Sequence, residues 1–243
     1  MPDSAEASPF DGLSRRGFLA GHAGVAGVAL AAGATSSAVA AGERAEDKHG
    51  DKVTPDQALK WLKQGNRRWV KRDIKRVDHT PPYRDITKGQ WPIASILSCA
   101  DSRVNPENIF DVAQGNLFNV RNAGNVRGSI SIGSVEYSIG VLRAPLLVVL
   151  GHSGCGAVKA AQRALRTGEM PGGDIDAVVE AILPAIEGLP ADQTLEQGIW
   201  ANAGHSARLL RRTSEIIATR IRSRKLRLVV GVYDIGTREV TFA

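Results

Sequence analysis

The sequence predicts an α/β fold with a mostly parallel central sheet flanked by helices, an N-terminal helical arm and a C-terminal edge strand. Apolar runs at residues 93–98, 117–120, 146–150 and 226–233 are predicted to be buried strands, because they are short, continuous and rich in Val, Ile and Leu. Most of them are separated by long stretches with helical periodicity, and such crossovers are typical of a parallel sheet that is covered on both faces. The aromatic content of 5% fits an aliphatic core of this kind.

The start of the chain is predicted to lie outside this fold. The motif S-R-R-G-F-L at residues 14–19 is the twin-arginine pattern of a bacterial export signal, and a charge-free stretch rich in Ala and Gly follows it. It closes with A-V-A at residues 38–40, which suits signal peptidase. We therefore expect a signal peptide over 1–40, a linker over 41–53, and a periplasmic or secreted protein with no stable membrane anchor after cleavage. The alternative, a transmembrane anchor, is disfavoured by the Gly and polar residues of the stretch.

Residues 54–243 are predicted to form a single domain, since no linker-like composition divides them. Thr54 followed by Pro55 is the pattern of a helix start, and the helix that follows carries Trp61 and Trp69 at helical spacing. An exposed apolar patch of this kind usually marks an interface. We expect this arm to lie on a neighbouring subunit, in a homodimer or a higher homo-oligomer.

The remaining elements follow in order along the chain. Helices are predicted over residues 130–142, 155–166, 175–186 and 197–223, and a short edge strand over 239–242. The formal net charge is +6, but we expect no nucleic-acid partner for an exported protein. The basic run at residues 220–225 is typical of a solvated helix end, where cations favour the helix dipole.

The only two cysteines of the sequence both follow predicted strands, where ligands bind in open α/β sheets. Cys99 follows the first strand, and Cys155 follows the third, three residues after His152. Two thiolates and an imidazole make a zinc site with a fourth position left for water or substrate. We predict one Zn²⁺ per chain at Cys99, His152 and Cys155. The alternative is a disulfide, which folding in the reducing cytoplasm before twin-arginine export disfavours.

Asp101 is the nearest candidate for a fourth ligand, and Arg103 lies two residues further on. An arginine competes for a neighbouring carboxylate through bidentate hydrogen bonds. That competition is useful in a catalytic site and has no purpose in a structural one, so we predict an open site with Asp101 and Arg103 as catalytic residues. Gly156 is predicted to begin a helix, where its N–H can bind an oxygen of a negatively charged substrate.

From about residue 54 to its end, the sequence resembles the β-class carbonic anhydrases. The resemblance rests on C-A-D-S-R at residues 99–103 together with H-S-G-C-G at 152–156, and it is supported by F-N-V-R-N at 118–122 and G-V-Y-D at 231–234. It implies a zinc lyase that converts CO₂ to bicarbonate and a proton, with an active-site cleft at a dimer interface. It also implies that Gln90, Phe118 and Tyr137 bind substrate.

Two other functions stay open for the same residues. Some relatives carry a valine where this chain has Ala123, and the wider pocket that follows leaves hydrolysis of CS₂ or COS at the same zinc as an alternative. A non-catalytic zinc-binding or redox protein is the other alternative. The pair formed by Asp101 and Arg103 argues against it, because neither metal storage nor thiol exchange needs that pair.

Overall fold

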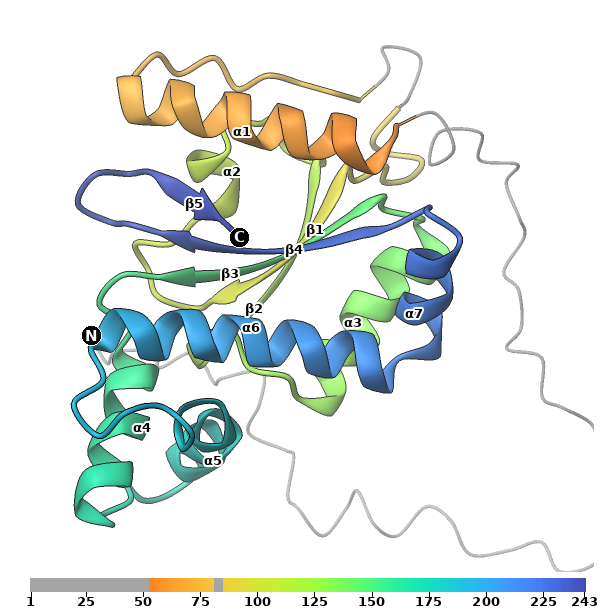
Figure 1. Cartoon of the computed structure of the whole chain (residues 1–243). Helices are drawn as coiled ribbons and strands as arrows, with labels where there is room; N and C mark the ends of the chain where they lie inside the picture. The colour runs from red at the N-terminus through yellow and green to blue at the C-terminus, as the bar shows by residue number, and fades with distance from the viewer. Residues whose placement is uncertain (1–52, 81–84) are drawn as a thin grey trace, which may run out of the picture. The chain divides into compact units, whose positions relative to one another are not determined.

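The computed structural model describes residues 53–80 and 85–243 (Figure 1). Within these residues, one five-stranded sheet has the strand order β2-β1-β3-β4-β5. Its strands are β1 (Ala94–Cys99), β2 (Leu117–Asn122), β3 (Leu146–His152), β4 (Arg227–Tyr233) and β5 (Val240–Phe242). The first four are parallel, and β5 pairs antiparallel with β4 at one edge. The predicted parallel sheet and C-terminal edge strand are confirmed. The proposed signal peptide and nearly all of the proposed linker lie outside the described residues.

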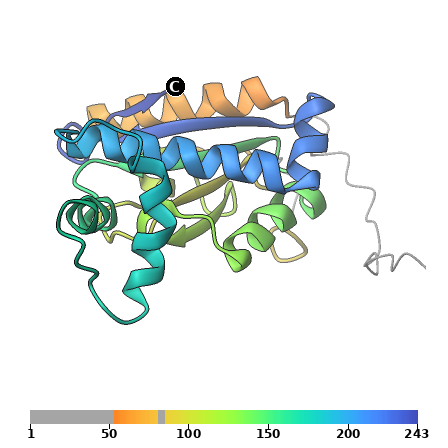
Figure 2. The same ribbon diagram turned by 60° about the horizontal axis from the view of Figure 1, so that its bottom comes forward.

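The two central strands are buried along their whole length. Every residue of β1 and of β3 is buried, because helices cover both faces of the sheet (Figures 1 and 2). This double burial explains why the sequence shows continuous apolar runs there and no alternation of polar and apolar residues. None of the helices in the described part of the chain is long and apolar enough to span a membrane.

One face of the sheet is covered by α1 (Pro55–Lys71) and α2 (Pro106–Ile109). Thr54 caps α1, and its hydroxyl accepts a hydrogen bond from the Gln57 N–H at 3.1 Å. Trp61 stacks on His79 with ring centroids 4.2 Å apart, and the Trp69 indole N–H donates to the Tyr233 hydroxyl at 3.2 Å. The expectation that this helix lies on a neighbouring subunit is therefore wrong for its tryptophan face. That face packs on the core of its own chain.

The opposite face is covered by α3 (Ser129–Glu136), the π-turn η2 (Tyr137–Val141), α6 (Leu195–Thr213) and α7 (Glu215–Arg222). The single helix predicted over 197–223 is two helices, because Ser214 leaves the helical conformation (φ −105°, ψ 110°) and its hydroxyl caps α7 by accepting from the Ile217 N–H at 3.2 Å. Apolar periodicity continues across this break, so the sequence pattern does not show it.

A third layer gathers where β3 ends. The 3-10 turn η1 (Ala123–Asn125) follows β2, and α4 (Gly156–Thr167) and α5 (Ile175–Ile186) pack beside the start of α6. Figure 1 shows α4 and α5 below α6, on the side to which the β3 arrow points. Their apolar core includes both cysteines. The carboxyl ends of the parallel strands are thus enclosed by helices, and the candidate site lies among them.

Candidate active site

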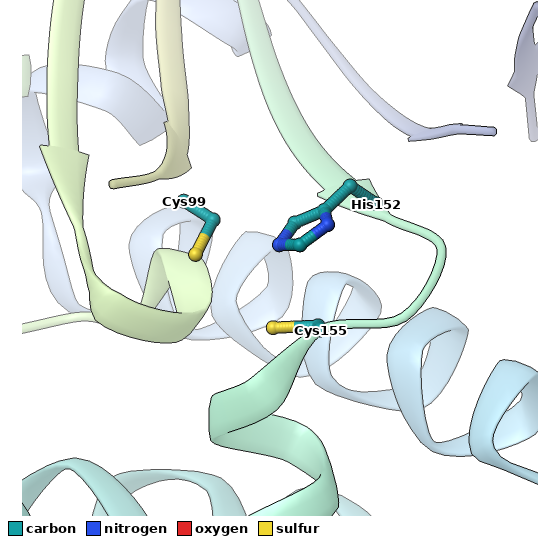
Figure 3. A group of neighbouring side chains, drawn as sticks. All are labelled: Cys99, His152 and Cys155. Atoms are coloured by element: carbon teal, nitrogen blue, oxygen red, sulfur yellow. The ribbon is translucent and has the colours of Figure 1, made fainter. Parts of the chain in front are cut away.

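The three predicted metal ligands converge at the carboxyl ends of neighbouring strands. Cys99 is the last residue of β1 and His152 the last of β3, while Cys155 is the N-cap of α4. Because β1 and β3 are paired in parallel, with Ser98 opposite Leu150, their ends lie side by side. Figure 3 shows the three side chains directed toward one another. Their ligand atoms all lie within 4.8 Å of one another, and all three residues are buried.

This arrangement fits a tetrahedral metal ion. Zinc with sulfur ligands at about 2.3 Å and nitrogen at about 2.0 Å would place these ligands roughly 3.5–3.8 Å apart, which the cluster reaches with a small closure. The His152 Nδ1–H lies 3.0 Å from the Ser153 carbonyl oxygen and can donate to it, which leaves Nε2 with its lone pair toward the cluster. Among the described residues the buried Nε2 has no hydrogen-bond partner. A metal ion would give this atom the partner that the protein does not provide.

The two cysteines shift each other's pKa in opposite directions. The hydrogen bond from the Cys155 thiol lowers the pKa of Cys99 to about 4 against the opposing effect of burial, and the His152 ring and the Gly124 N–H act in the same direction as the thiol. The pKa of Cys155 is raised, first because its proton is held by Cys99 and second because it is buried. One thiolate is therefore ready to bind a cation, and metal binding displaces the proton that remains.

Asp101 and Arg103 form a hydrogen-bonded ion pair beside this cluster. The Arg103 backbone N–H and Nε donate to Asp101 Oδ1 at 3.0 and 2.9 Å, and Nη2 donates to Oδ2 at 2.7 Å. The Arg103 guanidinium holds the pKa of the Asp101 carboxyl well below its usual range. Asp101 Oδ2 lies 4.0 Å from His152 Nε2, so the carboxylate borders the metal ligands while the arginine holds it. That Asp101 binds the metal directly stays a prediction.

The predicted substrate residues do not all lie near these ligands. Gly156 is the exposed first residue of α4, directly after Cys155. Gln90 is exposed in the segment before β1, and the hydrogen bonds of the described residues include none between Gln90 and the metal ligands. Their roles in binding substrate stay predictions.

Phe118, with Tyr137 in contact with it, lies far from the predicted metal ligands of its own chain. Phe118 is in register with Ser95, four residues before Cys99 on the paired strand, which places it about 13 Å along the sheet from Cys99. Its ring contacts Tyr137 with centroids 6.2 Å apart, and Tyr137 is 47% exposed. The two rings therefore form a surface pair that cannot line a pocket over their own chain's cluster.

Two further contacts with the site were missed at the level of sequence. Arg121 donates from Nε to the Cys99 carbonyl oxygen at 3.2 Å and from Nη2 to that of Asp101 at 2.8 Å. The Gly124 N–H donates to Cys99 Sγ at 3.3 Å. Arg121 and Gly124 reach the site because β2 pairs with β1 in this register. The sequence motif at residues 118–122 includes Arg121, but no motif indicates Gly124.

Comparison with known proteins agrees with this geometry. The family described as carbonic anhydrase matches residues 94–240. Over 192 residues the chain is 40% identical to carbonic anhydrase 2 of Mycobacterium tuberculosis, covering 75% of this chain and 90% of the relative. Among solved structures, the β-carbonic anhydrase CcaA is 27% identical with a TM-score of 0.54, covering 65% of this chain and 82% of that one. A β-carbonic anhydrase from Sordaria macrospora, 23% identical, shares the fold with a TM-score of 0.57 over 65% of this chain and 83% of its own. The chain belongs to the carbonic anhydrase family, in its β class.

Proposed function

We propose that this protein catalyses the reversible hydration of CO₂ to bicarbonate and a proton, with one Zn²⁺ held by Cys99, His152 and Cys155. The observation that carries the proposal is the convergence of these three donors beside a carboxylate that an arginine holds. When bound, zinc supplies the Lewis-acid activation of water on which this reaction depends. The relatives at this level of similarity are named carbonic anhydrases.

The Asp101–Arg103 pair has two tasks in this proposal. The three hydrogen bonds from Arg103 hold the Asp101 carboxylate turned away from the fourth ligand position. An ionised carboxylate at that place accepts a hydrogen bond from the attacking water and orients its lone pair toward CO₂. The Gly156 N–H, at the N-terminus of α4, stabilises the negative charge that develops on the bicarbonate oxygens.

We propose further that two subunits complete each substrate pocket. Phe118 and Tyr137 lie too far along the sheet to serve their own chain, so a partner's cluster is the one that they can cover. Tyr137 lies on the consecutive elements α3 and η2 together with Ile130 and Val141, two apolar residues that are 85% and 62% exposed. The structural relatives from Sordaria macrospora are described as tetrameric. A homodimer through α3 and η2 would bury this surface.

The test is stopped-flow CO₂ hydration with a pH indicator, on purified protein of measured zinc content. We expect turnover that scales with bound zinc. A fully loaded protein that does not accelerate hydration would overturn the proposal. Sulfide release from COS, measured in parallel, tests the alternative that the small side chain of Ala123 leaves open. For the part of the chain that the structure does not describe, we propose that residues 1–40 direct export by the twin-arginine route, on the basis of the R-R motif.

A further inference from the structure

The metal ligand Cys99 receives a hydrogen bond from the backbone of the turn η1. The Gly124 N–H lies 3.3 Å from Cys99 Sγ, within the usual range for a sulfur acceptor, and both residues are buried. An N–H that donates to a thiolate sulfur withdraws electron density from it, which changes the charge that the sulfur can give to a metal. The direction of this N–H is therefore a property of the metal centre.

The backbone that presents this N–H is held in an unusual conformation. Gly124 and Asn125 both have positive φ, 72° and 45°. A Cβ on Gly124 would lie 2.9 Å from Ile182 Cδ1 and 3.0 Å from Ala157 Cβ, so this close approach requires glycine. The backbone of a glycine also rotates more freely than that of any other residue. Another contact is therefore needed to keep the Gly124 N–H pointing at the sulfur.

Asn202 provides that restraint from a distant part of the chain. It lies on α6, is 1% exposed, and its Nδ2 donates to the Gly124 carbonyl oxygen at 2.8 Å across 78 residues of sequence. Among the described residues its Oδ1 has no hydrogen-bond partner. Burying an unpaired oxygen destabilises the fold, and the bond to Gly124 offsets that penalty. The contact of the Asn202 side chain with Gly124 is therefore made by its N–H donor and not by its oxygen.

We propose that Asn202 is a positioning residue of the metal centre: by holding the Gly124 carbonyl, it keeps the Gly124 N–H on the Cys99 sulfur and so sets the charge that this thiolate gives to the metal. The inference rests on the proposed metal site. It predicts that a change on α6, with no contact to the metal or the substrate, alters the electronic properties of the bound ion.

Asn202→Leu and Asn202→Ala test this, because both remove the N–H donor and neither adds a group that can ionise or donate in its place. The matched control is Asn66→Leu. Asn66 is an equally buried amide, 5% exposed, whose Nδ2 donates to the Ile109 and Arg238 carbonyl oxygens at 3.1 and 2.9 Å in the core under α1. The control loses a comparable buried amide without touching the metal centre.

The readouts are the thiolate-to-metal charge-transfer bands of the Co²⁺-substituted proteins and competition for Co²⁺ with a chelator at pH 7. Without the N–H, the sulfur is more electron-rich, so we expect both Asn202 variants to shift the bands to longer wavelength. Protons then compete more strongly for the thiol, so apparent Co²⁺ affinity should fall by about 10-fold, the low end for outer-shell partners. The Asn66→Leu protein should keep the wild-type bands and affinity.

Folded Asn202 variants with wild-type bands and affinity would overturn the inference alone. Wild-type protein that shows no thiolate bands with Co²⁺ would overturn the proposed metal site and this inference together. A measurement on the wild-type protein keeps the inference testable even if the Asn202 variants do not fold. In ¹¹³Cd-substituted wild-type protein with ¹⁵N-labelled glycine, the Gly124 amide proton should show a coupling to the metal through the hydrogen bond, and absence of that coupling would also overturn the inference.

Discussion

Gly124→Ala should destabilise the protein, because the structure gives this position no room for a side chain. The left-handed conformation (φ 72°) costs a non-glycine residue about 1–2 kcal/mol. The added Cβ would lie 2.9 Å from Ile182 Cδ1 and 3.0 Å from Ala157 Cβ, an overpacking that costs about 1–3 kcal/mol. Alanine also restricts the unfolded chain, which offsets about 0.4–1 kcal/mol. We expect a net loss of about 1–5 kcal/mol in the free energy of unfolding.

Urea unfolding of metal-free protein measures this loss, and Gly168→Ala is its matched control. Gly168 has φ 74° but no atom within 4 Å of an added Cβ, so it should show the backbone strain alone, about 1–2 kcal/mol before the same offset. Ile182→Val removes the atom in closest contact and should cost about 0.5–1.5 kcal/mol by itself. In the Gly124→Ala background it should cost less than that. Equal losses at Gly124 and Gly168, or additive losses in the double variant, would refute the packing argument.

Four further outcomes test the function. Cys155→Ser should lose most of its zinc by atomic absorption after dialysis against a mild chelator, and full occupancy would remove this residue from the ligand set. Arg103→Ala should keep its zinc and lose about 10²-fold in CO₂ turnover, the scale of a misplaced catalytic group; near-normal turnover would contradict its assigned role. Val141→Asp should lower both the mass by light scattering and the turnover, whereas Leu165→Asp, an exposed apolar residue on α4, should change neither. Lysines in place of the arginines at 15–16 should retain precursor in the cytoplasm, and normal export would exclude the twin-arginine route.

The sheet could be predicted because its signals are local and strong. Continuous apolar runs mark β1 and β3, which are buried throughout, and their ends place Cys99 and His152 together once the strands are parallel. The tryptophans of α1 show the limit of this reasoning. Their spacing predicts an apolar face, but the sequence does not say what covers that face. The structure shows that their own chain covers it.

The second layer of the site could not be predicted, because it depends on register and not on motif. Gly124 reaches Cys99 since β2 pairs with β1 so that Asn122 lies opposite Cys99 and the next turn folds back over the sulfur. Asn202 reaches Gly124 only because the first turns of α6 pack beside Gly151, near the end of β3. No spacing in the sequence relates residues that are 78 positions apart. The proposed metal ligands are thus visible as motifs, while the groups that contact them are visible only in three dimensions.

We expect Arg103 to act on Asp101 by holding its carboxylate in place and not by keeping it ionised. The pH dependence of activity in Arg103→Ala distinguishes these two roles. Arg103 depresses the pKa of Asp101, so this carboxylate stabilises the folded state above its ordinary pKa of about 3.9 and loses that contribution only as the pH falls below it. In Arg103→Ala the pKa should return toward that ordinary value, which still leaves Asp101 ionised at pH 7. If ionisation were the only role of Arg103, the variant would be fully active at pH 7. If Arg103 holds the carboxylate away from the metal, activity stays low in the variant and raising the pH from 7 to 9 does not restore it. Recovery to the wild-type rate over that range, measured at constant zinc content, would show that the positional argument is wrong.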